Sequence, residues 1–93
     1  MVVGMMKLSI HAPGARSLKD KRQVVRSVKD RVKSRFNVSI AEVDDQDLWQ
    51  RISLGVAVVA SDAGHADSQL QSVLSFISAN VDILDVATEL VSR

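Results

Sequence analysis

The chain has 93 residues, of which 46% are hydrophobic and 25% charged, so it is long enough for one small globular domain and too short for two. It contains no cysteine, which excludes disulfides, thiolate nucleophiles and zinc–thiolate sites and suits a reducing compartment. The N-terminal run MVVGMMKLSI is interrupted by Lys7 and is too short for a signal peptide or membrane span, so we expect a cytoplasmic protein that does not contact membranes.

The first half of the chain predicts a strand, a helix and a second strand. Apolar and polar side chains alternate over residues 2–11, which is typical of a half-buried strand, and residues 12–16 form a loop. Ser17 with Asp20 three residues later is a variant capping box that begins a helix, which Asn37 can end. The helix carries an apolar row at helical spacing: Leu18, Val25, Val28, Val32 and Phe36. Residues 38–41 alternate again and predict the second strand.

The second half predicts a polar turn over residues 44–47, a strand over residues 52–60, a helix and a last strand. Ser61 or Asp62 caps the helix, and Asn80 suits its C-terminal end. Its apolar row is Ala66, Leu70, Val73, Leu74 and Ile77. In the last strand we expect Leu84, Val86 and Leu90 to face the core. The order βαββαβ predicts one ferredoxin-like α+β domain over residues 1–93, a four-stranded antiparallel sheet with both helices on one face.

The basic residues are concentrated in the first predicted helix. Residues 16–35 hold nine basic and two acidic side chains, a balance of +7, whereas the rest of the chain has three basic and nine acidic residues, a balance of −6. The net charge of +1 therefore hides a polarised molecule, and a dense basic surface attracts polyanions. The nine are Arg16, Lys19, Lys21, Arg22, Arg26, Lys29, Arg31, Lys33 and Arg35.

Five of these cations recur every three or four residues and form one row along the helix. We call this row the basic stripe: Lys19, Arg22, Arg26, Lys29 and Lys33. A merely solvated helix face usually mixes acidic with basic residues, and cations in the first turn oppose the helix dipole. A bound phosphate would reverse that penalty. We predict a nucleic-acid-binding surface, with a solvated face as the simpler alternative: Arg16, Lys19, Lys21, Arg22, Arg26, Lys29 and Lys33.

The sheet face away from the helices is predicted to carry small side chains and no aromatic ones on the first and third strands. This excludes base stacking of the RNA-recognition-motif kind. A flat and partly apolar face suits docking against a partner or a second copy, so we expect a homodimer that uses Met5, Ser53, Gly55 and Ala57. On the last strand we place Ile83, Asp85, Ala87, Glu89 and Val91 on this face. Trp49 and Arg51, after the polar turn, are possible partner contacts.

No catalytic constellation, cofactor motif or metal-ligand spacing is visible. The acidic turn lacks the glycine and distal glutamate of a calcium loop, and the two histidines stand far apart. A small-anion or acyl-phosphate site at the loop Gly14–Arg16 remains an alternative, although the third predicted strand has no asparagine of the kind that acylphosphatases use.

Three segments resemble the YlxP-like family, small bacterial proteins of unknown function: Arg16–Arg22, Arg35–Ser39 and Asp47–Arg51. The similarity runs through nearly the whole chain. It differs at Asp20, where the family often has glutamate, and at Asp45, where it often has histidine, which leaves any histidine-dependent role at that position in doubt. The resemblance implies a ferredoxin-like fold, a cytoplasmic location and a role near the ribosome or its RNA, because family members are commonly encoded beside translation-initiation and ribosome-maturation factors. It implies no catalytic residue.

Together these observations lead to the hypothesis of a non-enzymatic module that binds RNA or a ribosomal subunit through its first helix. The rival is a protein-interaction module that docks through the open sheet face.

Overall fold

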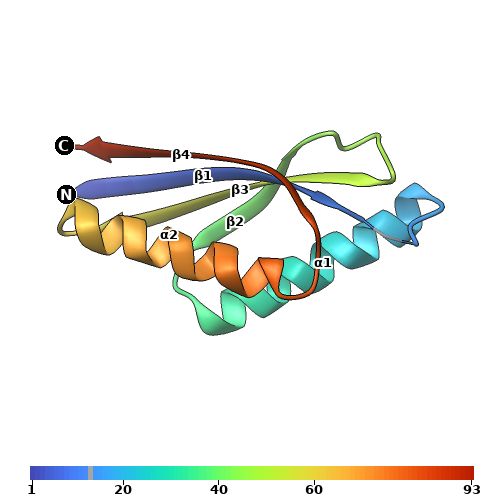
Figure 1. The fold of residues 1–93 in the computed structure, drawn as a ribbon, viewed down its shortest axis with the longest axis horizontal. Helices are drawn as coiled ribbons and strands as arrows, with labels where there is room; N and C mark the ends of the chain where they lie inside the picture. Colours follow the sequence, from blue (N-terminus) through green and yellow to red (C-terminus); the bar gives the residue numbers. More distant parts are fainter. Residues whose placement is uncertain (13) are drawn as a thin grey trace.

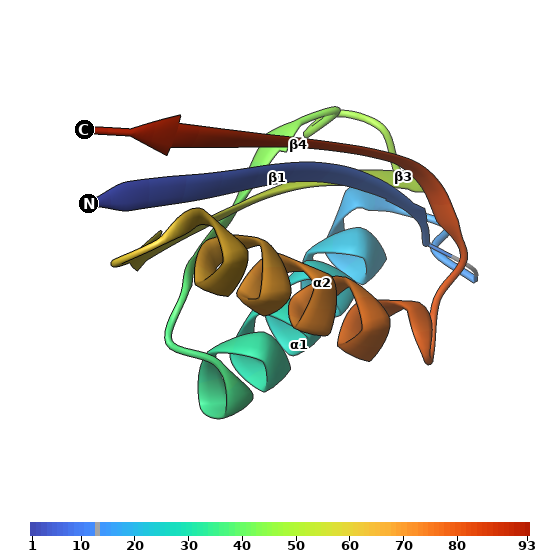
Figure 2. The same cartoon turned by 60° about the vertical axis from the view of Figure 1, so that its left-hand side comes forward.

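The computed structural model describes residues 1–12 and 14–93, and its six elements follow the predicted order. They are β1 (Val2–His11), α1 (Leu18–Arg35), β2 (Ser39–Asp44), β3 (Arg51–Ala60), α2 (Ala63–Ser78) and β4 (Ile83–Ser92). The strands form one antiparallel sheet in the order β2-β3-β1-β4. Both helices lie on one face of this sheet and the other face is bare (Figures 1 and 2), so the predicted ferredoxin-like fold is confirmed. Pro13, in the predicted loop, lies outside the described residues.

The ends of the helices depend on side-chain caps. Ser17 Oγ accepts the Asp20 N–H at 3.1 Å, and Asp62, rather than Ser61, caps α2 by accepting the His65 N–H at 2.8 Å. The Asp20 carboxylate accepts the Arg16 N–H at 3.1 Å and not that of Ser17, so the reciprocal half of the capping box reaches one residue further back. Both helices end two residues before the asparagines expected to end them, at Arg35 and Ser78.

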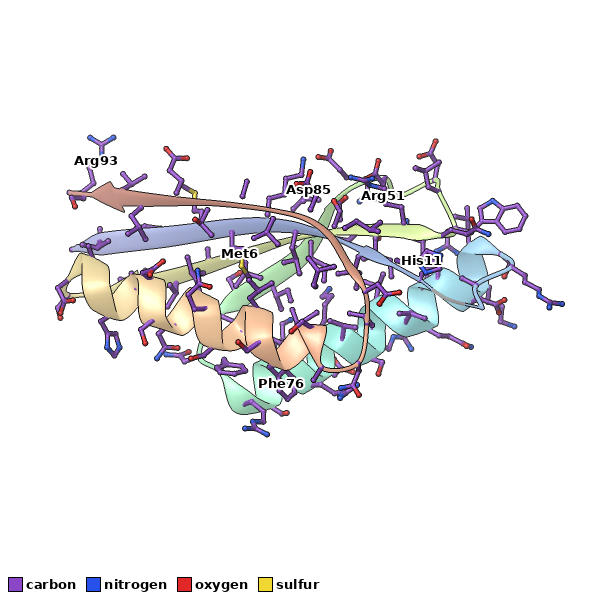
Figure 3. All side chains as sticks on the ribbon, in the orientation of Figure 1. Met6, His11, Arg51, Phe76, Asp85 and Arg93 are labelled. Carbon is purple, nitrogen blue, oxygen red and sulfur yellow. The ribbon has the colours of Figure 1, made fainter. Side chains whose placement is uncertain are left out.

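The core lies between the sheet and the two helices and is almost wholly aliphatic. Met6, which points from β1 toward α2 in Figure 3, is buried with Leu8 and Ile10 of the same strand. α2 comes close to β1 at Gly4, where an added Cβ would lie 3.0 Å from Leu70 Cδ1. Between the helices, the rings of Phe36 and Phe76 pack edge to face, with their centroids 5.6 Å apart.

The last strand differs from the prediction in two ways. A register shift between Ser9 and Ile10 places Ile83 opposite Ile10, on the helix face, rather than on the open face. Val86 and Leu90 do face the helix side, opposite Leu8 and Gly4, yet their side chains remain exposed. The expectation that they would close the core was wrong: β4 is an edge strand, and neither side chain belongs to the buried core.

Candidate polyanion interface

The basic stripe lies on the side of α1 that adjoins the edge strand β2. Four of its members, Arg22, Arg26, Lys29 and Lys33, line an open hollow of about 420 Å³ together with Glu42 of β2. The helical spacing holds these cations in a row, because residues three and four apart are neighbours on a helix surface. The structure therefore brings most of the predicted binding residues to one continuous surface.

The cations of this surface are not neutralised by the protein. Within residues 1–12 and 14–93 the ion pairs are Lys7–Asp44, Lys21–Glu42 and Arg51–Asp45, and none includes a residue of the basic stripe or Arg16. Asp30 is the acidic residue of α1 that borders the hollow. Of these cations, all but Lys29, which is half-buried, are exposed. A row of unpaired cations at regular spacing is the arrangement that phosphate groups of a polyanion can neutralise.

Two other cations of α1 serve a different purpose. The guanidinium carbons of Arg31 and Arg35 lie 5.7 and 5.1 Å from the ring centroid of Phe76, on the flank of α1 that faces α2. These are cation–π contacts that hold the two helices together. The same helix therefore has one flank used for packing and one flank of free charge.

Lys21 does not belong to the exposed surface, and its assignment as a nucleic-acid contact was wrong. Its residue is 1% exposed, and its ammonium lies 2.9 Å from Glu42 Oε2. The Nζ donates its hydrogen bond to the carbonyl oxygen of Asp45, so the contact with Glu42 is an ion pair without hydrogen-bond geometry. Lys21 thus fixes the first turn of α1 to the β2–β3 connection, and a phosphate outside cannot reach it.

The sequence held a signal for this pair. Lys21 lies four residues before Val25 in the apolar row, and Glu42 lies two residues after Ile40, so each stands at a core-facing position of its own element. Opposite charges at buried positions of two neighbouring elements point to a buried pair, because a single buried charge is far more costly than a paired one.

Asp45 is the centre of a second polar network, on the open face of the sheet. Its backbone has φ of +58°, a left-handed conformation that aspartate tolerates better than most residues. Its Oδ2 accepts hydrogen bonds from Ser53 Oγ at 2.6 Å and from Arg51 Nε at 3.2 Å, and Ser53 Oγ also lies 2.9 Å from Ser9 Oγ. The Ser53 hydrogen bond, followed by the charge of Arg51, holds the pKa of Asp45 below its ordinary value.

This network changes the predicted dimer surface. Ser53 is buried beneath Asp45, so its assignment as an interface residue was wrong, whereas Met5, Gly55 and Ala57 line an apolar groove of about 500 Å³. Beside the groove is a polar pocket of about 260 Å³ that Arg51 and Asp85 border, and Figure 3 shows both of them on the open side of the sheet. Lys7 pairs with Asp44 at this pocket, and the hydrogen bond with Asp44 raises the pKa of Lys7.

Trp49 lies in the β2–β3 connection, and its side chain is half exposed. This exposure is consistent with the predicted role as a partner contact, which stays a prediction. Arg51 is engaged by Asp45 and contributes to the pocket rather than to a free surface.

The loop before α1 uses its own backbone donors. The Ala15 N–H bonds to the Ala12 carbonyl, and the Arg16 N–H bonds to Asp20. Gly14 has φ of +78°, which suits a tight turn. An anion at this loop would compete with the Asp20 carboxylate, which disfavours the acyl-phosphate alternative.

Among the residues that the structure describes, no helix is both long and apolar enough to cross a membrane.

Comparison with known proteins assigns the chain to a family whose function is not established. Residues 3–89 match the family described as "Protein of unknown function (DUF503)". The chain is also similar to the "Uncharacterized protein YlxP" of Bacillus subtilis (strain 168), with 46% identity over 69 residues, which is 74% of this chain and 75% of that protein. Neither name includes an enzymatic activity. The family match covers most of the chain and agrees with the resemblance drawn from its three segments, and the chain therefore belongs to the DUF503 family.

Proposed function

We propose that this protein is a non-enzymatic RNA-binding module that lays the basic stripe of α1 along the phosphates of an RNA strand, in the ribosome or in one of its precursors. The observation that carries the proposal is the row of cations on α1 without any ion pair among the described residues, next to a hollow bordered by β2. Because such contacts reach phosphate and not base edges, binding is expected to tolerate changes in RNA sequence.

The composition of the bare sheet face also favours binding through α1 rather than through the sheet. β1 and β3 carry no aromatic side chain for bases to stack on, and the described aromatic residues lie elsewhere: Phe36 and Phe76 between the helices, and Trp49 in a loop. Recognition by stacking on the sheet is therefore disfavoured. Binding through the helix alone makes the interaction predominantly electrostatic.

The test is binding of labelled single-stranded RNA and of purified small ribosomal subunits across a salt series. If about four phosphates are neutralised, the slope of log affinity against log salt is about −3 to −4. The variant Arg26→Glu/Lys29→Glu reverses two charges in the hollow and should abolish binding at moderate salt. The control Arg31→Glu/Arg35→Glu makes the same change in net charge on the flank beside Phe76 and should retain most of it, with circular dichroism verifying that both variants are folded.

Equal loss in the two double variants would show that net charge alone governs the interaction and would contradict the proposed surface. A slope near zero for the wild type would contradict the phosphate mechanism. Binding to an acidic protein but not to RNA would contradict the proposal and favour the rival function, in which the basic stripe contacts a protein.

A further inference from the structure

The outer edge of β4 has few of the features that keep edge strands from pairing. β4 stands at one end of the sheet and pairs with β1 on its other side. It runs for 10 residues and contains neither lysine nor proline, which natural edge strands use to prevent association. The opposite edge strand, β2, has only 6 residues, and each of the two edge strands has one register shift against its neighbour. Of the two edges, β4 is therefore the better template for another strand.

The helix side of β4 also carries exposed apolar side chains. Val86 and Leu90 are 36% and 40% exposed although they stand opposite β1 residues that belong to the buried side of the sheet. Leu84, at the register shift, is 51% exposed. Exposed aliphatic side chains in a row beside an unpaired strand edge are typical of an interaction site.

We propose that β4 pairs antiparallel with β4 of a second copy of this chain, around a two-fold axis at Thr88, so that the two sheets become one. The helices of both copies then lie on the same face of the joined sheet. Backbone hydrogen bonds supply the pairing, and the apolar rows of the two strands cover each other.

The charges of β4 select the register. With the axis at Ala87, Asp85 of one copy would stand directly opposite Glu89 of the other, and with the axis at Glu89 the two Glu89 carboxylates would oppose each other. Like charges directly opposite are destabilising. With the axis at Thr88, Glu89 stands opposite Ala87 of the other copy, and no two acidic residues oppose each other.

The same register brings the apolar residues together. It places Val86 of each copy opposite Leu90 of the other, on the helix face, so that both exposed side chains gain an aliphatic neighbour. An axis two residues closer to the N-terminus, at Val86, would instead draw the irregular segment around Leu84 into the ladder. The register around Thr88 thus separates the acidic residues and pairs the exposed aliphatic ones.

The dimer would also set the spacing of the basic stripes, and this part rests on the proposed function. α1 lies against β2, the strand at the far edge from β4. The two basic stripes would therefore lie at the outer edges of one face of the joined sheet, available to two separate segments of RNA.

The first test is the oligomeric state without RNA, by sedimentation velocity over the micromolar range, so that its outcome is independent of the proposed function. The wild type is expected to dimerise, and Leu90→Lys to be monomeric with an unchanged circular dichroism spectrum. The control Val59→Lys adds the same charge on the open face of β3 at a side chain that is 65% exposed, and it should remain dimeric. A monomeric wild type, or a dimer broken by Ala57→Arg but not by Leu90→Lys, would overturn the proposal.

The second test determines the register by disulfide formation between introduced cysteines. The chain has no cysteine of its own, so any disulfide must join the introduced residues. Residues directly opposite in an antiparallel pair have Cα atoms about 4.5–5.5 Å apart, within the range of a disulfide. Thr88→Cys should therefore form a covalent dimer under mild oxidation. Ala87→Cys and Glu89→Cys, whose copies would be offset diagonally by about 7–8 Å, should not. Cross-linking of Ala87→Cys in preference to Thr88→Cys would overturn the register.

Discussion

The ammonium of Lys21 lies 2.9 Å from the carboxylate of Glu42, in an ion pair that joins the first turn of α1 to the edge strand β2. The side chain of Lys21 is 2% exposed and that of Glu42 is 19% exposed, so water solvates the pair on the Glu42 side only. A lysine in the densest basic segment of the chain is therefore structural, whereas its neighbours on the helix are free.

Removing one partner of this pair should destabilise the fold strongly. Lys21→Met leaves Glu42 with an uncompensated charge, and the loss expected for a buried pair is about 3–5 kcal/mol, with the lower end applying here because Glu42 is partly solvated. The double variant Lys21→Met/Glu42→Leu should recover most of the free energy of unfolding. Urea denaturation checks both values.

The matched control is Lys19→Met, which removes an exposed cation two residues away and should leave stability within about 0.5 kcal/mol. If Lys19→Met and Lys21→Met proved equally stable, the buried pair would have no structural role.

Protonation of Asp45 should weaken the fold in acid. Because its pKa is lowered in the folded state by Ser53 and Arg51, its stabilising contribution is fully present above its ordinary pKa of 3.8 and is lost as the pH falls through its lower folded-state value. In the variant Asp45→Asn, asparagine also tolerates the left-handed backbone but carries no charge. The variant should therefore be less stable at neutral pH and lose less stability than the wild type as the pH falls. Thermal unfolding of both proteins between pH 2 and 7 makes the comparison, and parallel curves would contradict it.

Two glycines of the sheet should respond differently to alanine. At Gly4 the added Cβ lies 3.0 Å from Leu70 Cδ1 and 3.1 Å from Val58 Cγ1, both in the core, so we expect a loss of about 1–3 kcal/mol by overpacking. At Gly55 the Cβ lies 2.9 Å from Val43 Cγ1, but Val43 is on the surface and can turn away. Chemical denaturation should place Gly55→Ala close to the wild type, and the reverse order would show that α2 is not tightly packed on β1.

Phe76 should matter for stability and not for RNA binding. Phe76→Leu removes the edge-to-face contact with Phe36 and the cation–π contacts with Arg31 and Arg35, which together amount to about 1–2 kcal/mol. These contacts lie on the flank of α1 opposite to the hollow. The salt slope of RNA binding should therefore match that of the wild type, and a weaker slope would place the RNA between the helices instead.

The periodic apolar positions predicted the fold well, because each element buries one face and repeats at its own period. The cap at Ser17 and the strand Val2–His11 follow directly from local rules. The position of Ile83 did not follow, because a register shift depends on pairing with a strand that is distant in sequence.

The candidate site was predicted only in part for a related reason. The charges of the basic stripe are visible in the sequence, and helical spacing places them on one surface. The fates of Lys21 and Ser53 depend on the β2–β3 connection, whose left-handed Asp45 brings a carbonyl to one and a carboxylate to the other. A side chain's partner in another element is a tertiary property, which composition and spacing do not contain.

Asp45 has a mechanical consequence for the molecule. Its carbonyl oxygen accepts from Lys21 at the start of α1, while its carboxylate accepts from Ser53 and Arg51 on the opposite side of the sheet. Displacing Asp45 from the open face would therefore disturb its hydrogen bond with Lys21 in the first turn of the basic helix. Asp45 therefore links the open face of the sheet to the first turn of the basic helix through a single residue. Any coupling between ligands on the two sides that passes through Asp45 has to be equal in both directions.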